Sequence, residues 1–139
     1  MADLTASTAL RDFIANRLTT TGGVFMFATL HSAITNIAAD SVYSSSGLLE
    51  LTSANGYTAG GKTCGTVTQT AGVVDCPDVV WTTGGGETLT AGASCIWIND
   101  VDDINGAALV SMNDSAQTAG NGGTMTAGLV NPITIPTAD

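Results

Sequence analysis

Basic residues are nearly absent from this sequence. Three of its 139 residues are Lys or Arg and twelve are Asp or Glu, which gives a net charge of −9 and a pI near 4.1. A nucleic-acid-binding surface needs cations to neutralise phosphates, and anionic membrane surfaces repel an acidic chain. Neither nucleic acid nor a membrane is therefore an expected partner.

Histidine and aromatic residues are scarce as well. The single histidine, His31, excludes any site that needs two imidazoles and leaves one ring for a nucleophile–base pair. Its position at the end of an apolar run predicts a structural or surface residue. Two Trp and two Tyr are few for a carbohydrate site, and Trp81 and Trp97 lie in strand patterns typical of core or interface. We expect no catalytic residue and no enzymatic activity.

The sequence also has no long hydrophobic run. Its longest apolar stretch, residues 24–34, has about half the length of a membrane-spanning helix. Residues 1–4 show no basic region followed by an apolar core, and there is no lipidation motif. The expectation is a protein made in the cytoplasm without a secretory signal or membrane anchor.

The residues that are abundant favour β-structure. Thr numbers 22, Gly 17 and Ala 19, and Val, Ile and Leu together number 28, whereas charged residues make up only 11%. This apolar content, with a mean hydropathy of +0.30, argues against disorder. β-Branched residues interspersed with glycine suit sheets joined by tight turns. The length fits one domain.

The hydrophobic pattern changes once along the chain. Apolar residues recur at spacings of three and four over residues 5–18, which predicts a helix or arm. After Gly23, short runs and turn signals predict strands; residues 63–70 alternate as one strand and Ala71-Gly72 turns the chain. The sequence predicts a single domain over residues 1–139, mainly β. It combines an antiparallel β-sandwich or barrel-like domain over 24–135 with one short N-terminal helix.

Residues 56–63, Gly-Tyr-Thr-Ala-Gly-Gly-Lys-Thr, match the phosphate-loop pattern G-x-x-x-x-G-K-[ST]. In a nucleotide site the loop amides hold phosphates, the lysine reaches the β- and γ-oxygens and the hydroxyl binds magnesium. The helix that should follow is missing, because residues 64–76 hold two glycines and alternate as a strand. We therefore interpret Gly56, Gly61, Lys62 and Thr63 as a turn and strand start without a cofactor. Nucleotide binding is the alternative.

Three acidic residues, Asp100, Asp102 and Asp103, resemble part of a calcium loop. When the loop pattern is aligned on Gly106, its first ligand position falls on Val101, and no helices flank the segment. An acidic hairpin turn is therefore the favoured interpretation, and an irregular calcium site is the alternative. Zinc is not favoured, because the cysteines form no Cys-x-x-Cys pair and one histidine is available.

The three cysteines are an odd count without a signal peptide, which favours free thiols. A hairpin turning at residues 70–72 nonetheless places Cys64 and Cys76 almost opposite each other. These two are candidates for a cross-strand disulfide if the assembled protein meets oxidising conditions.

A series of features follows in order over residues 5–135: a short helix, an apolar strand ending in Leu30-His31, a Ser/Ala-rich loop, the stretch 56–63, Asp-Val-Val-Trp-Thr at 78–82, Ile-Trp-Ile-Asn-Asp at 96–100, Ala-Leu-Val at 108–110, and a Gly-rich turn before a β finish at 120–135. This order resembles the small structural proteins of tailed bacteriophages, which are capsid decoration, cement or fibre-like proteins. The resemblance implies a place in the virion after synthesis in the host cytoplasm. It also implies contacts with the major capsid protein or other virion proteins, and with further copies of the chain.

The expected function is therefore capsid decoration or cementing by an oligomer, through protein–protein contacts. The alternative is a tail or fibre-associated module that binds a host-surface glycan, which exposed Trp or Tyr on a concave face would favour. A third hypothesis is a phosphate-binding enzyme that uses residues 56–63.

Overall fold

The computed structural model describes residues 25–33, 43, 49–99, 107–129 and 133–134. Within them the chain forms strands and no helix. In chain order these are β1 (Phe25–His31), β2 (Lys62–Thr63), β3 (Thr68–Thr70), β4 (Val73–Asp75), β5 (Val79–Thr82), β6 (Thr88–Ala91), β7 (Ala93–Asn99), β8 (Ala108–Asn113), β9 (Gln117–Gly120), β10 (Thr124–Ala127) and β11 (Ile133–Thr134). The helix expected at 5–18 and the acidic residues Asp100, Asp102 and Asp103 lie outside the described residues.

All ladders between these strands are antiparallel. One sheet has the strand order β2-β1-β7-β8, a second has β11-β4-β3, and two further pairs are β10-β5 and β6-β9. The prediction of a mainly β chain built from antiparallel sheets is thus confirmed.

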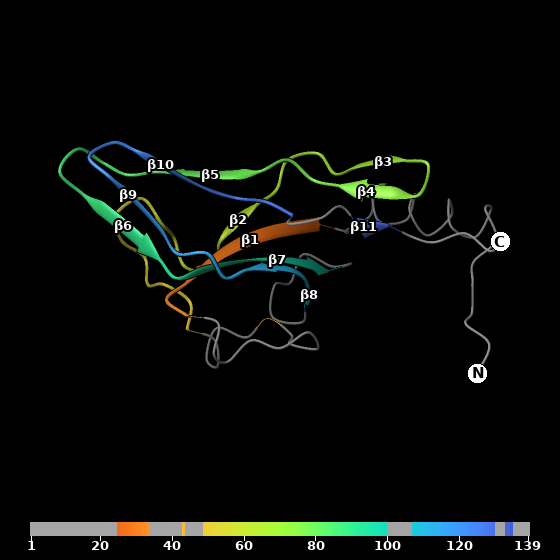
Figure 1. The fold of residues 1–139 in the computed structure, drawn as a ribbon, viewed down its shortest axis with the longest axis horizontal. Coiled ribbons are helices and arrows are strands. Elements are labelled where there is room, and N and C mark those ends of the chain that lie inside the picture. Colours follow the sequence, from red (N-terminus) through yellow and green to blue (C-terminus); the bar gives the residue numbers. More distant parts are fainter. Residues whose placement is uncertain (1–24, 34–42, 44–48, 100–106, 130–132, 135–139) are drawn as a thin grey trace.

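Two arms of the chain pair along one long ribbon. β5, β6 and β7 run in succession, and their partners β10, β9 and β8 run in the reverse order. Figure 1 shows the ribbon folding back on itself: β5 and β10 lie in one layer, β7 lies in the other, and β6 with β9 slants between them. This fold-back brings two apolar faces together.

The space between the layers is filled by an apolar core, which we call the inner cluster. Burial alternates along β5 and β10, so that every second side chain points into this core. β1 and β7 supply the facing residues. The buried members of the inner cluster are Met26, Ala28, Leu30, Tyr57, Val74, Cys76, Val79, Trp81, Leu89, Ala91, Ile96, Ala119, Met125 and Ala127.

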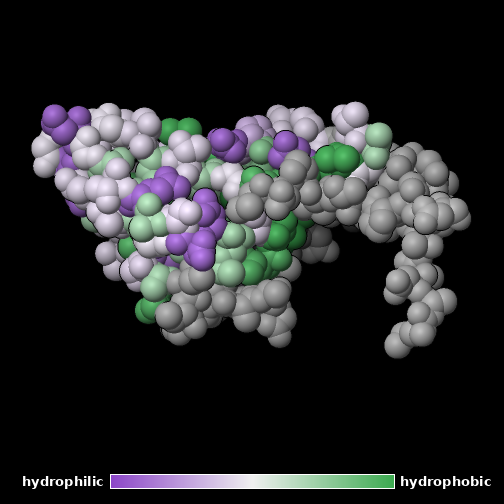
Figure 2. Space-filling model, in the orientation of Figure 1, coloured by the Kyte–Doolittle hydropathy of each residue, from purple (hydrophilic) through white to green (hydrophobic). Residues whose placement is uncertain are grey.

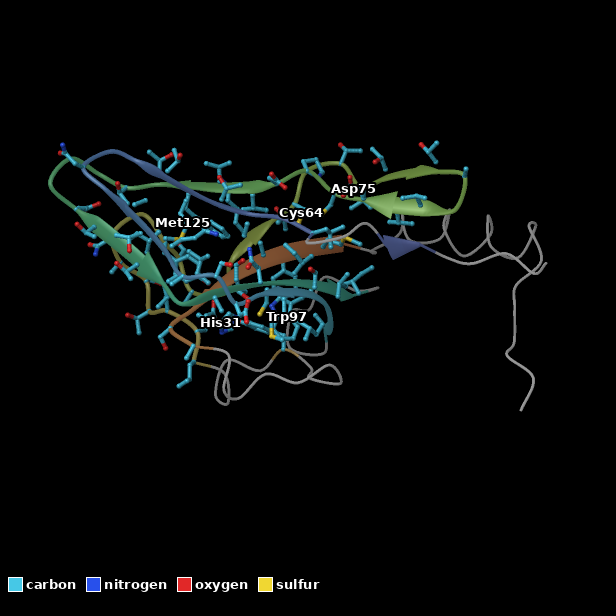
Figure 3. All side chains as sticks on the ribbon, in the orientation of Figure 1. His31, Cys64, Asp75, Trp97 and Met125 are labelled. Atoms are coloured by element: carbon cyan, nitrogen blue, oxygen red, sulfur yellow. The ribbon has the colours of Figure 1, made fainter. Side chains whose placement is uncertain are left out.

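A second core, the outer cluster, consists of Phe27, Tyr43, Cys95, Trp97 and Ala107. Phe27, Cys95 and Trp97 belong to the same strands as the inner cluster but alternate with its members, so the β1–β7 pair is buried on both faces. Figure 3 shows Trp97 and His31 on one side of this pair and Met125 on the other. Double burial explains why β1 is almost continuously apolar.

The prediction of one strand over residues 63–70 is wrong. β2 pairs with β1, whereas β3 pairs with β4 in a different sheet, so the chain leaves strand geometry between them to change sheets. The expected turn at Ala71-Gly72 is present, with φ values of 50° and 80°, and it joins β3 to β4 as a hairpin.

Candidate functional site

Residues 56–61 form a loop that contacts both layers, and Lys62 and Thr63 of β2 follow it. Gly56 has φ +89° and Gly61 has φ +74°, values that L side chains rarely adopt. A Cβ on Gly56 would overlap the carbonyl oxygen of Thr82 in β5, and a Cβ on Gly61 would overlap that of Ala28 in β1. The two glycines therefore let the loop touch the backbone of both layers.

The amides of this loop are used within the protein. Four of them donate to nearby acceptors: Tyr57 N–H to Ala54 O (2.9 Å), Ala59 N–H to Ser53 Oγ (2.9 Å), Gly60 N–H to Glu50 Oε1 (2.7 Å) and Gly61 N–H to Thr58 O (3.1 Å). A phosphate site needs such amides aimed at the anion and a helix N-terminus behind them. Here β2 follows the loop.

A small cavity of about 290 Å³ lies between the loop and β5. Gly56, Thr58, Gly61 and Lys62 line one side, and residues 80–82 line the other. Lys62 is the single charged group in this lining, and its Nζ donates to the carbonyl oxygen of Val80 at 3.0 Å. The lysine thus ties β2 to β5, an interaction that does not need a ligand.

Glu50 is the centre of a polar network that joins the two cores. Its carboxylate accepts hydrogen bonds from Tyr43 OH (2.6 Å), Tyr57 OH (2.6 Å) and the Gly60 amide. Tyr57 belongs to the inner cluster and Tyr43 to the outer cluster. Burial first, and then the hydrogen bond to Glu50, raises the pKa of both phenols above the ordinary value.

This network was not anticipated from the sequence. Its signal is weak: Tyr43 and Tyr57 each lie seven residues from Glu50, a spacing without meaning in a strand or helix. In the described residues the network holds one carboxylate, whereas paired-carboxylate hydrolysis needs two. Its evident role is to hold the segment at Glu50 against β1, where His31 and Glu50 form a bridge.

His31 is fully buried in the lower layer. Trp97 Nε1–H donates to Thr29 Oγ1 at 2.7 Å, and Thr29 Oγ1 lies 2.7 Å from His31 Nε2. Thr29 Oγ1 donates to His31 Nε2 or accepts from it according to the tautomer of the ring. Nδ1 has no hydrogen-bond partner in the described structure.

The environment of His31 does not suit a catalytic base. Burial lowers its pKa below the ordinary value of 6.5, with Glu50 opposing the shift. The thiol on the same sheet face, Cys95, is itself buried, which raises its pKa to about 12. A nucleophilic cysteine needs a lowered pKa instead.

Protonation of His31 supplies a testable pH dependence. The unfolded chain takes up a proton near pH 6.5, whereas the folded chain resists it, so stability is complete above pH 6.5 and falls below it. We expect the unfolding free energy to fall by up to about 1.4 kcal/mol per pH unit below pH 6.5. Urea titrations between pH 7.5 and about 5 measure this slope. A stability that does not change over this pH range would contradict the lowered pKa of His31. His31→Gln, which cannot titrate, is the matched control.

The other sequence candidates are placed as follows. Cys64 and Cys76 are adjacent free thiols, Cys64 half-buried and Cys76 buried. Across the described residues no three His, Cys, Asp or Glu side chains gather as a metal site. The described part of the chain also holds no helix long and apolar enough to cross a membrane.

No family model, curated protein or solved structure matches this chain.

Proposed function

We propose that this chain is a non-enzymatic structural protein of a bacteriophage virion, an antiparallel β-sandwich with an N-terminal helix that decorates or cements the capsid. The observation that supports this most is the composition of its outward strand positions. Eight of the twelve outward positions on β3–β6, β9 and β10 are threonine, and one, Asp75, is charged. These positions are Thr68, Thr70, Val73, Asp75, Val80, Thr82, Thr88, Thr90, Thr118, Gly120, Thr124 and Thr126.

Such a surface suits close packing against another protein. The core of a protein–protein interface is depleted of charged residues, because their desolvation is costly. Threonine is stiff at χ1, so it loses less side-chain entropy in a contact than Lys or Glu would. In Figure 2 most described residues have intermediate hydropathy, with few strongly hydrophilic ones between them. Protein–protein contact is therefore the function that this surface supports best.

The polar side chains add support for a non-enzymatic role. His31, Glu50 and Lys62 all have partners inside the protein and hold segments of the fold together. The described residues bring no nucleophile, base and free donor to one place.

A glycan-binding role is less well supported. Sugar recognition commonly uses an exposed aromatic ring face, but Tyr43, Tyr57, Trp81 and Trp97 are each at most 4% exposed. Among the described residues these four side chains serve the two cores. A tail or fibre module that binds a glycan would need other groups.

Co-sedimentation with undecorated phage shells tests the proposal. We expect multi-angle light scattering to give a defined oligomer, and the protein to pellet with shells to saturation. Thr126→Lys places a charge on the outward surface and should weaken binding by roughly tenfold or more, since an unpaired interface charge is costly. Ala116→Lys, at an exposed loop position, is the matched control.

Two outcomes would contradict the proposal. A monomer that stays in the supernatant with both shells and tails overturns the structural role. Unchanged binding of Thr126→Lys overturns the assignment of the outward surface as the contact.

A further inference from the structure

Two cysteines from different sheets meet at one end of the inner cluster. Cys64 directly follows β2, and its amide donates to Met26 O of β1 at 2.8 Å. Cys76 directly follows β4, and its amide donates to Asp75 Oδ1 at 2.9 Å. Both side chains pack in the inner cluster. Figure 3 marks Cys64 close to Asp75, at the point where the chain passes from β4 toward β5.

The residues after each cysteine confirm how close the two segments are. A Cβ on Gly65 would lie 3.2 Å from Pro77 Cγ, so the Gly65 backbone packs against the Pro77 ring immediately beside the thiols. The register of the β3–β4 hairpin, with Thr68 opposite Asp75, places Val67 rather than Cys64 level with Cys76. The bend between β2 and β3 nevertheless brings the Cys64 side chain close to Cys76.

The Cys64 and Cys76 side chains lie close enough to affect each other's ionisation. Interaction with the partner thiol, the largest cause in each case, raises the pKa of Cys64 and lowers the pKa of Cys76. Opposite shifts of this kind arise when one thiol stabilises the thiolate of the other.

We propose that Cys64 and Cys76 are a disulfide-forming site, which joins the end of β2 to the end of β4 when the protein meets a small-molecule disulfide. The inference is independent of the capsid proposal, because it depends only on the contact between two segments of one chain. It adds a covalent link between the four-stranded and the three-stranded sheet.

The chemistry balances as two thiol–disulfide exchanges. The thiolate of one cysteine attacks one sulfur of the small disulfide, forms a mixed disulfide and releases one small thiolate. The other cysteine, as thiolate, then attacks the sulfur of the first cysteine and releases the second small thiolate. The two cysteines lose two electrons and two protons, and the small disulfide takes up both as two thiols.

Cys95 provides the internal control. It is 1% exposed in the outer cluster, on the opposite face of the β1–β7 pair from the inner cluster. Its buried thiol has a raised pKa, so it should react with neither the oxidant nor the pair.

Oxidised glutathione is the probe. After incubation, the intact mass should fall by about 2 Da, and alkylation after denaturation should label one cysteine instead of three. The melting temperature should rise by roughly 5–10 °C, because the link closes residues 64–76 into a loop. Cys95→Ala should show the same change in mass and melting temperature and leave no thiol to alkylate, and Cys64→Ser, at a half-buried position, should show none of these changes.

Cleavage after glutamate locates the bond. Cutting at Glu50 and Glu87 separates residues 51–87, which hold Cys64 and Cys76, from residues 88–139, which hold Cys95. We expect the lost mass in the first fragment and no link between the two. Three alkylatable thiols after oxidation, a stable mixed disulfide with glutathione, or a bond joining the two fragments would each overturn the proposal.

Discussion

Gly61→Ala should strongly destabilise the protein. Two penalties add at this position: a left-handed φ of +74°, and overlap of the new Cβ with the Ala28 carbonyl oxygen. That oxygen belongs to β1, an inner strand of the four-stranded sheet, and cannot move without disturbing the ladders to β2 and β7. We expect a loss of roughly 3–5 kcal/mol in the free energy of unfolding, measured by urea titration.

Two glycines in one exposed turn separate these penalties. Gly86 has φ +81° with nothing within 4 Å of an added Cβ, so Gly86→Ala should cost about 1 kcal/mol for the backbone alone. Gly85 has open space and no left-handed φ, so Gly85→Ala should stay within about 0.5 kcal/mol of the parent. If Gly61→Ala lowers the free energy of unfolding by no more than Gly86→Ala does, the loop does not approach β1 as closely as described.

The same variant set bears on the phosphate-loop match. In a nucleotide site, Lys62 would matter for ligand binding, and ATP or GTP with magnesium would raise the melting temperature. In the structure Lys62 instead donates to Val80 O. We expect Lys62→Met to cost less than Gly61→Ala, and either nucleotide to leave the melting temperature unchanged.

Glu50→Ala should cost about 4 kcal/mol in the free energy of unfolding, since it removes the acceptor of three donors, and hydrogen bonds to a charged group contribute about 1.5–3 kcal/mol each. Water entering this half-buried site offsets part of the sum. Both tyrosine hydroxyls then lose their acceptor, and the inner and outer clusters lose their polar connection. Chemical unfolding monitored by tryptophan fluorescence reports this loss, because Trp81 and Trp97 lie in the two clusters.

Glu87 is the matched control for Glu50. It is exposed and accepts one hydrogen bond, from the Gly84 amide at 2.8 Å, so Glu87→Ala should cost about 1 kcal/mol or less. In the Glu50→Ala background, Tyr43→Phe and Tyr57→Phe should each remove a hydroxyl that has lost its acceptor, and so recover part of the lost free energy of unfolding. A double-mutant cycle of either tyrosine with Glu50 should show positive coupling. Equal costs for the two glutamates would show that Glu50 has no central role.

Local sequence signals were sufficient where neighbours in the chain decide the structure. Ala71-Gly72 was expected to turn the chain, and both residues adopt positive φ in the β3–β4 hairpin. Short runs after Gly23 predict strands, and β5 and β10 form there with burial that alternates along each strand. Residues 63–70 show the limit: their alternation is continuous, yet the chain changes sheets after Thr63.

The sequence by itself determined the antiparallel β class, the shortage of cations, and the threonine-rich outward positions, because composition and a two-residue period are local properties. Tertiary structure alone decided that Glu50 joins Tyr43 to Tyr57, that four amides of the loop 56–61 are satisfied internally, and that a bend rather than the hairpin register brings Cys64 to Cys76. These contacts depend on strand register and on how the ribbon folds back to stack its layers. Both are set by burial of the whole apolar surface at once, which no short stretch of residues encodes.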